Sequence, residues 1–356
     1  MGQTMSEEIE AAADATVCCA TCGIAEQVLR RHPVLDDIEM VRCTDCDLVR
    51  YCSDKCQRNH WPKHKEECKR RVAEIRDEIL FKQPEGSHLG DCPICCLPMP
   101  LDYSQSTLTG CCSKIICKGC DFASEKREKE MRIKGTCLFC RHPAPKTEEE
   151  CFKQMMKRVE ASDPVAMYQQ GVLEYKKGDY RSAFKYWAQA AELGDAGAHY
   201  QLSVMYYDGK GVEKDEKKEI HHLEEAAVGG HPYARCIVGD YEWYTLNVER
   251  AVKHWIIAAT QGHDDAIKAL MEKFKMGCVS KEELATALRA HQAAVDGMKS
   301  PQREAAKKKC VDYSTFTFSK EDFAAALRAH QAAVDATKIP KRKAIEKNRR
   351  SSKFGS

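Results

Sequence analysis

The chain has 356 residues, enough for two or three domains, and a formal net charge of +2. This balance gives no general attraction to nucleic acids or anionic membranes, so direct nucleic-acid binding is not expected. No apolar run approaches the roughly 18–20 residues that a membrane-spanning helix needs. Of the 21 cysteines, only Cys236, Cys278 and Cys310 lie beyond residue 151. We therefore expect a metal-rich front half and an ordinary helical second half.

Residues 1–16 are rich in alanine and glutamate and are predicted to be a disordered acidic leader. They contain neither the basic nor the apolar segment of a secretory signal, so we expect an intracellular protein, in the cytoplasm, the nucleus or both. Gly2 and Ser6 satisfy the N-myristoylation pattern, but the glutamates that come after them would oppose an anionic leaflet. A single acyl chain also anchors weakly, so lipidation is the less favoured alternative.

Residues 17–69 carry cysteine pairs and a histidine at the short spacings of zinc ligands. In a protein that is not secreted, such cysteines bind metal more readily than they form disulfides. The stretch YCSDKCQRNHWPKHKEEC, residues 51–68, closely resembles the MYND-type zinc finger. The resemblance implies two interleaved zinc sites whose ligands are Cys19, Cys22, Cys43, Cys46, Cys52, Cys56, His64 and Cys68.

In that family the first and third pairs share one zinc, and the second and fourth pairs share the other. Residues 23–42 form a longer insertion than the family usually has. A domain this small lacks a sufficient apolar core, so the metal itself is expected to fold it. By the same resemblance, Gln57 and Trp61 are candidates for a groove that binds short proline-containing peptides.

Apolar residues recur at helical spacing after the finger, and a proline and a glycine end the run at positions 84 and 86. The pattern predicts a helix over residues 69–82, and we assign residues 70–88 as a linker helix between the two zinc modules. A second charged, helix-prone stretch, residues 122–135, pairs glutamates with lysines and arginines three or four places apart and predicts a solvated helix.

Residues 89–145 contain four further cysteine pairs, and their order resembles a RING-type zinc finger of the all-cysteine kind. The resemblance implies a first site from pairs one and three and a second site from pairs two and four. The expected ligands are Cys92, Cys95, Cys117 and Cys120 for the first site and Cys111, Cys112, Cys137 and Cys140 for the second. Most members place Cys-x-His where this chain has adjacent cysteines, so Cys111 is either a ligand, which we favour, or a spare thiol.

RING fingers act by holding a ubiquitin-charged conjugating enzyme in a reactive arrangement, without a covalent intermediate. Two residues match features of active members. Ile94 lies between the first two ligands, where an aliphatic side chain contacts the conjugating enzyme, and Arg141 follows the last ligand, where an arginine bridges ubiquitin and enzyme. This chain lacks the proline that commonly follows the seventh ligand. It also lacks the tryptophan that many active members carry between the sixth and seventh ligands. The module is therefore either a ligase or a metal-stabilised interaction module.

Beyond residue 146 the sequence repeats itself. The stretch WAQAAELG at 187–194 is echoed at 223–229 and at 255–262, each time after a helix that carries Gly171/Tyr175, Ser203/Tyr207 or Gly239/Trp243. The pattern resembles Sel1-like repeats, with three copies over about residues 163–263 and a degenerate fourth from residue 264. The resemblance implies an all-α solenoid over residues 160–300 whose concave side binds other proteins.

The stretch SKEELATALRAHQAAVD at 280–296 returns as SKEDFAAALRAHQAAVD at 319–335. Each copy is predicted to form an amphipathic helix, and one copy is expected to cap the open end of the solenoid. The second copy lies in the segment over residues 301–338, which we assign as the duplicated amphipathic helix. A basic tail over residues 339–356 comes next. The tail is either solvated and disordered or a nuclear-import signal.

The predicted architecture is therefore multi-domain: two small zinc-stabilised modules, holding four Zn²⁺ ions, followed by an all-α Sel1-like solenoid. The first functional hypothesis is an intracellular adaptor for proteins or proline-containing peptides. The second is a RING-type ubiquitin ligase that engages a ubiquitin-conjugating enzyme and uses the other modules to choose substrates. MYND fingers also occur in protein-lysine methyltransferases, but the sequence contains no stretch that resembles their catalytic domain.

Overall fold

The computed structural model of the protein describes residue 20 and residues 41–132 and 135–310. The chain separates into two compact units, one ending at Lys82 and the other beginning at Gln83. Several predictions concern positions outside the described residues. These are the acidic leader with Gly2, the ligands Cys19 and Cys22, the second ALRAHQAAVD copy and the basic tail.

The first unit is a short hairpin followed by one long helix. Strands β1 (Val41–Arg42) and β2 (Arg50–Tyr51) pair antiparallel, and helix α3 (Asp54–Leu80) comes directly after them. Ser53 caps the helix by accepting a hydrogen bond from the backbone N–H of Cys56. The helix predicted over residues 69–82 is thus the second half of a longer helix that begins inside the finger. It ends at Leu80, so the linker predicted as far as residue 88 is not helical to its end.

The second unit begins with a module built on an antiparallel hairpin. A 3₁₀ turn (Tyr103–Gln105) leads into β3 (Ser106–Thr109), which pairs with β4 (Lys114–Cys117), and α4 (Lys118–Met131) comes next. Helix α4 begins earlier than the helix predicted over residues 122–135. It ends where Arg132 adopts a left-handed conformation with φ of 52°.

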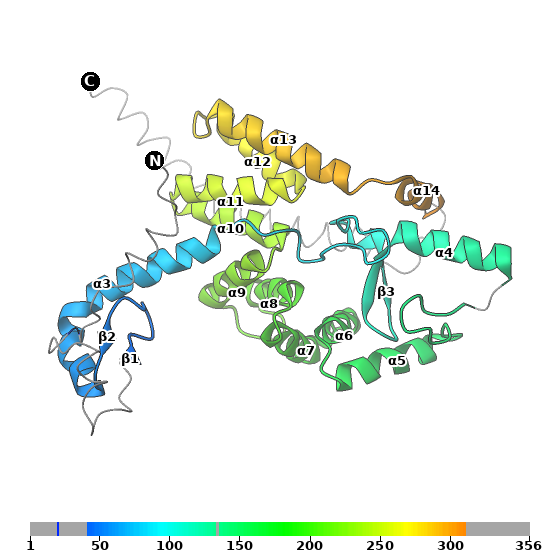
Figure 1. Ribbon diagram of the computed structural model, residues 1–356, viewed down its shortest axis with the longest axis horizontal. Helices are drawn as coiled ribbons and strands as arrows, with labels where there is room; N and C mark the ends of the chain where they lie inside the picture. Colours follow the sequence, from blue (N-terminus) through cyan, green and yellow to red (C-terminus); the bar gives the residue numbers. More distant parts are fainter. Residues whose placement is uncertain (1–19, 21–40, 133–134, 311–356) are drawn as a thin grey trace, which may run out of the picture. The chain divides into compact units, whose positions relative to one another are not determined.

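Ten further helices, α5 to α14, complete the described part of this unit (Figure 1). Within it, α6 to α13 form four successive antiparallel pairs, and α5 and α14 flank them. Their bounds are α5 (Glu148–Glu160), α6 (Pro164–Lys177), α7 (Tyr180–Glu192), α8 (Ala196–Asp208), α9 (Glu216–Val228), α10 (Pro232–Tyr244), α11 (Val248–Thr260), α12 (Asp264–Lys275), α13 (Lys281–Gly297) and α14 (Pro301–Cys310). This is the helical solenoid that the repeats predict, with α13 as the second helix of the degenerate fourth pair.

Each pair begins with a side chain that caps its first helix. Asp163, Asp195, His231 and His263 occupy equivalent positions, and each accepts a hydrogen bond from a backbone N–H of the helix that it precedes. The left-handed glycine that ends the preceding helix also recurs, since Gly194 and Gly262 both have φ of 86°. In the middle copy the equivalent residue is Gly230, one place after the glycine that the sequence motif indicates.

Close helix contacts explain the small residues in the motif. Ala190, Ala226 and Ala258 are completely buried, so neighbouring helices approach closely at each of them. A Cβ atom placed on Gly171 would lie 2.5 Å from Nε1 of Trp187, and one on Gly239 would lie 2.8 Å from Nε1 of Trp255. In these two pairs, the indole of the second helix therefore fills the space that glycine leaves on the first.

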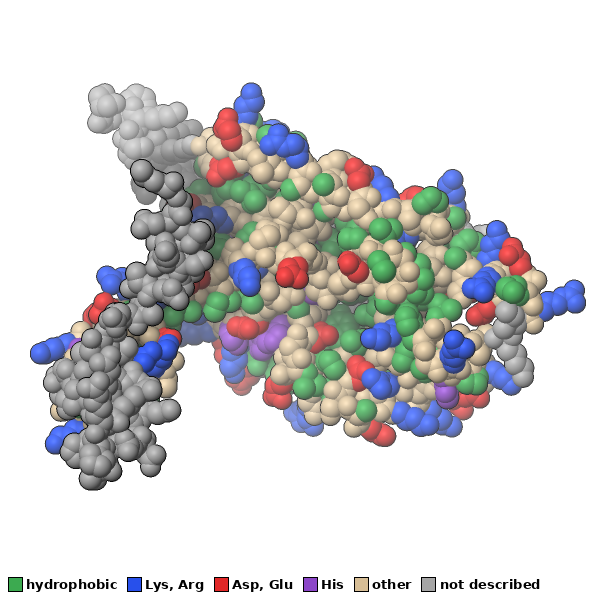
Figure 2. All heavy atoms as spheres, in the orientation of Figure 1, with side chains coloured by type: hydrophobic (Ala, Val, Ile, Leu, Met, Phe, Trp, Pro, Cys, Tyr) green, Lys and Arg blue, Asp and Glu red, His purple; other side chains and the backbone are tan. Residues whose placement is uncertain are grey.

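No helix among the described residues combines the length and the apolar character needed to cross a bilayer. On the face shown in Figure 2, basic and acidic side chains are interspersed rather than gathered by sign.

Candidate metal centres and the surfaces around them

The first cluster lies in the first unit and combines the hairpin with the helix. Cys43 and Cys46 come from the turn after β1, whereas His64 and Cys68 lie one turn apart on one face of α3. All four are buried, and their potential ligand atoms lie within 4.8 Å of one another. The Sγ atoms of Cys43 and Cys68 are 3.8 Å apart, which is about the edge of a tetrahedron with Zn–S bonds of about 2.3 Å.

The histidine of this cluster is oriented as a metal ligand. Nε2 of His64 lies 3.2 Å from Sγ of Cys46, while Nδ1 is buried without a hydrogen-bond partner. Burial raises the pKa of Cys43, but the backbone N–H groups of Cys46 and Asp45 donate to its sulfur and bring the pKa down to about 7. A thiolate, the form that binds metal, is therefore accessible near neutral pH.

The other expected site of the first finger is described only in part. Cys52 and Cys56 lie on either side of the start of α3, with their sulfurs 3.6 Å apart. Their expected partners Cys19 and Cys22 lie outside the described residues. The backbone N–H of Ala20, between those partners in sequence, donates to the carbonyl of Arg50, two residues before Cys52. Position 20 is thus close to the strand that leads to Cys52.

The second and third clusters lie in the hairpin module and draw on alternate cysteine pairs. Cys92 and Cys95 gather with Cys117 and Cys120, with Sγ separations of 3.9 Å both between Cys92 and Cys120 and between Cys95 and Cys117. The other group consists of Cys111, Cys112, Cys137 and Cys140. Pairs one and three thus form one cluster and pairs two and four the other, which is the arrangement that the resemblance to a RING-type finger implies.

Both adjacent cysteines of the β3–β4 turn face the third cluster. Sγ of Cys112 lies 3.6 Å from Sγ of Cys137, and Sγ of Cys111 lies 3.3 Å from Sγ of Cys140. Ser113, directly after them, has a φ of 55°, an uncommon value for a residue other than glycine. The chain thus adopts a strained turn there, and this turn brings two neighbouring sulfurs to one point.

Three Cys-x-x-Cys turns share one backbone geometry. The residue after the second cysteine, which is Asp47, Cys96 or Arg141, has φ between 53° and 58°. Its N–H donates to the carbonyl of the first cysteine at 2.8 to 3.0 Å. The geometry gives Arg141 a backbone role in its turn, and its side chain is exposed.

Burial raises the pKa of Cys92, but N–H groups of Cys117, Cys95 and Ile94 outweigh it and lower the pKa to about 7.

The remaining predicted residues lie at the surface. Ile94 is 42% exposed on the first turn of the hairpin module. Trp61 is 39% exposed on α3, with its ring edge-on to His64, and Gln57 is partly buried one turn earlier on the same helix. Gln57 and Trp61 therefore share a helix face, as a common binding surface requires.

One residue close to a cluster has no counterpart in the sequence predictions. Arg303 of α14 is 3% exposed. Its guanidinium donates to the carbonyls of Pro98 and Met298, both at 2.7 Å, and to Sγ of Cys95 at 3.5 Å. Its backbone also packs on α4, where a Cβ on Gly119 would lie 2.7 Å from the Arg303 nitrogen. Ser300 before Pro301 is a helix-start signal that marks α14, but nothing in the sequence marks the arginine as a neighbour of the cluster.

The solenoid is also in contact with the segment that enters the hairpin module. The backbone N–H of His88 donates to the carbonyl of Gly230 at 2.9 Å, and its ring stacks on His231 at a centroid distance of 4.1 Å. Nε2 of His88 lies 2.6 Å from the hydroxyl of Tyr103. Nε2 of Gln261 donates to the carbonyl of Gly86 at 2.8 Å. The hairpin module is therefore docked on the solenoid.

Comparison with known proteins identifies different families in the front and the back of the chain. Residues 18–68 match the family model of the MYND finger, and residues 165–195, 196–231 and 241–263 match that of the Sel1 repeat. The fold is thus an N-terminal zinc-finger region followed by a Sel1-type helical solenoid. The Cys and Cys/His clusters are compatible with zinc sites.

Similarity to individual proteins is confined to short stretches. The histone-lysine N-methyltransferase SMYD3 of Homo sapiens is 41% identical over 54 residues, which are 15% of this chain and 12% of that protein. An uncharacterized protein of Neisseria meningitidis serogroup B is 34% identical over 93 residues, 25% of this chain and 20% of that protein. The chain thus spans a fifth or less of these curated relatives. A solved Sel1 repeat protein from Oxalobacter formigenes is 29% identical, with a TM-score of 0.31, over 34% of this chain and 97% of that one.

Proposed function

We propose that the protein is an intracellular zinc-binding adaptor that brings other proteins together through its finger modules and its solenoid. The observation that carries the proposal is the joining of closed metal-ligand clusters to an array of helix pairs in one chain. MYND fingers and Sel1 repeats both mediate protein interactions, and neither needs a reactive group to do so. The metal's part is structural, because four protein ligands at a zinc ion leave no open position for a substrate.

The adaptor holds four zinc ions, two in each finger module. His64 with three cysteines forms one site of the MYND-type finger, and Cys52 with Cys56 and the pair at positions 19 and 22 forms the other. The hairpin module holds two all-cysteine sites, with Cys111 as a ligand. The sulfur separations of 3.3 to 3.9 Å within the described clusters support these assignments.

The MYND-type finger binds short proline-containing peptides across the α3 face that carries Gln57 and Trp61. An exposed indole next to a buried metal ligand gives a rigid apolar surface on which proline rings pack. Since His64 fixes this part of α3 to the metal, the surface is formed before the peptide arrives.

A library of proline-containing peptides, screened by fluorescence polarisation against the zinc-loaded protein, tests the adaptor function. We expect at least one peptide to bind, with affinity reduced about tenfold or more in Trp61→Ala. Phe152→Ala, which removes another exposed aromatic side chain, serves as the matched control. Zinc content is measured for both variants. The proposal fails if no peptide binds, or if bound peptides do not respond to the loss of Trp61.

A second candidate function, RING-type ubiquitin ligation, has one arrangement in its favour. The hairpin module combines interleaved clusters with an exposed Ile94 on its first turn and an exposed Arg141 after its last ligand. In this alternative, Ile94 contacts a ubiquitin-conjugating enzyme and Arg141 fixes its bound ubiquitin. The planar guanidinium of arginine suits such a bridge, and catalysis arises from positioning alone.

Mixing the protein with a panel of charged conjugating enzymes distinguishes the two candidates. Autoubiquitination that disappears in Ile94→Ala and Arg141→Ala supports the ligase. Leu246→Ala, which removes a side chain 63% exposed on the solenoid, is the control and should leave the reaction unchanged. If no conjugating enzyme gives ubiquitin transfer while all the zinc sites are occupied, the ligase function is refuted and the adaptor function is retained.

A further inference from the structure

Helix α13, the first copy of the duplicated sequence, covers a surface that α11 and α12 form together; we call this surface the α13 seat. Ala287 is completely buried there, in one core cluster with Trp255, Ile267 and Leu270. Nε2 of His291 lies 3.0 Å from a carboxylate oxygen of Asp264 at the start of α12. The α13 seat therefore recognises a small residue and a histidine one turn apart.

The end of α13 closes over a glycine of the solenoid. A Cβ on Gly262 would lie 3.6 Å from Cβ of Ala294, 3.7 Å from a methyl group of Val295 and 2.7 Å from the terminal methyl of Met298. At the other end, Ser280 and Glu283 form a reciprocal capping box, with hydrogen bonds of 3.1 and 2.8 Å.

The second copy, residues 319–335, carries the same residues at the positions that face the seat in the first. Ala287, His291, Ala294 and Val295 have identical counterparts 39 positions later, which are Ala326, His330, Ala333 and Val334. Leu284 is replaced by phenylalanine, and the capping box becomes Ser with Asp. The chain thus contains two sequences that fit one seat.

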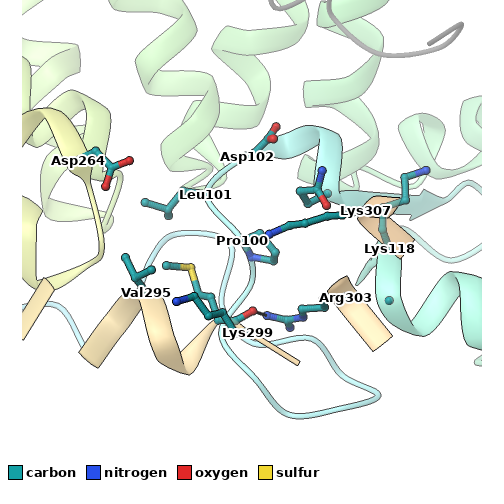
Figure 3. Close-up of a pocket in the computed structure, with 12 residues that line it drawn as sticks. Pro100, Leu101, Asp102, Lys118, Asp264, Val295, Lys299, Arg303 and Lys307 are labelled. Carbon is teal, nitrogen blue, oxygen red and sulfur yellow. Dashed lines mark hydrogen bonds between the residues drawn. The ribbon is translucent and has the colours of Figure 1, made fainter. Parts of the chain in front are cut away.

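Helix α14 connects the end of the first copy to the hairpin module. Its Arg303 donates to the Met298 carbonyl at the end of α13 and to Sγ of Cys95 in the hairpin module. Near this contact, side chains of the hairpin module, α12, α13 and α14 line an open pocket of about 280 Å³, and Figure 3 shows Pro100, Leu101, Val295 and Arg303 around it. Helix α14 is thus held both by the guanidinium contacts and by its packing on α4, where Ala306 is buried.

We propose that residues 319–335 of the same chain compete with α13 for the α13 seat, and that this exchange releases α14 and Arg303 from the hairpin module. The first copy is favoured, because the second can dock only if residues 280–318 form a long loop. The second copy also has threonine at the position of Met298. Attachment to the same chain nonetheless keeps its effective concentration at the seat high. Exchange uncovers the Cys95 turn, so occupancy of the seat controls access to the hairpin module.

Hydrogen exchange measured by mass spectrometry tests the competition, because peptides from the two copies differ in mass. Ala287→Glu places a charge on the buried face of the first copy, and Ala293→Glu, on the exposed face of the same helix, is its matched control. In Ala287→Glu we expect residues 319–335 to exchange at least tenfold more slowly than in Ala287→Glu/Ala326→Glu. Residues 301–310 should lose protection, and Ala293→Glu and Ala326→Glu alone should behave as the unaltered protein.

Two results overturn the proposal. Residues 319–335 exchanging equally fast in Ala287→Glu and in the double variant would show that the second copy does not enter the vacated seat. Light scattering that finds Ala287→Glu as a dimer, while its residues 319–335 are protected, would show that a second chain supplies the helix.

Discussion

Replacing Arg303 with alanine tests whether α14 is bound to the hairpin module through the metal cluster. The guanidinium donates to two backbone carbonyls at 2.7 Å and to Sγ of Cys95 at 3.5 Å, and the side chain is almost fully buried. Groups that hydrogen-bond to a metal ligand typically change metal affinity about 10–100-fold. We expect Arg303→Ala to weaken zinc binding at the Cys92/Cys95/Cys117/Cys120 site by that factor, or about 1.4–2.7 kcal/mol.

Competition with a chromogenic chelator measures the affinity, and hydrogen exchange reports whether α14 stays docked. Arg303→Lys should give an intermediate loss, because an ammonium keeps the charge but not the planar set of donors. Arg289→Ala, on the exposed side of α13, should release zinc as the unaltered protein does. If Arg303→Ala binds zinc as tightly as the unaltered protein does, and α14 stays protected, the reasoning is refuted.

Three further predictions concern other parts of the chain. His64→Ala should lose one zinc ion by native mass spectrometry and unfold the first unit, whereas His60→Ala, which removes a stacked neighbour outside the cluster, should keep the ion. Gly171→Ala should lower the free energy of unfolding by about 1–3 kcal/mol in urea titrations, because its Cβ clashes with the packed indole; Gly297→Ala, which meets nothing within 4 Å, should not. Burial, reinforced by nearby arginines, lowers the pKa of His254 to about 3, so its contribution to stability is complete above pH 6.5 and is lost as the pH falls toward 3. His254→Gln should therefore reduce the slope of unfolding free energy against pH in that window by up to about 1.4 kcal/mol per pH unit, and an unchanged slope would exclude a buried neutral histidine.

The repeats are predictable from the sequence because each one solves the same packing problem with the same residues. The alanine pair and the left-handed glycine recur in all three copies, and the glycine that faces a tryptophan recurs in the first and the third. Short spacings mark the cysteine pairs as metal ligands, whereas the grouping of the pairs into sites is what the resemblance to the two finger families implies. The structure brings together Cys43, Cys46, His64 and Cys68 as the resemblance implies, and likewise the interleaved cysteines of the hairpin module.

Long-range contacts are not predictable in this way. The continuity of α3 through Pro62 runs against the usual effect of proline inside a helix, so no local signal joins the finger to the helix after it. His88 reaches the solenoid from an irregular segment without periodicity, and the hydroxyl of Tyr103 lies beside its ring. Arg303 meets Cys95 across more than 200 residues, and a lone arginine after a serine–proline pair carries no sign of its partner.

Hydrogen exchange before and after removal of metal by a strong chelator tests the central claim most directly. If captured zinc organises the front of the chain, α3 and the hairpin module should lose protection once the metal is gone. Helices α6 to α11 should keep theirs, because stacking of helix pairs stabilises them without metal. Full protection of residues 41–81 and 91–131 after complete metal removal would contradict the account.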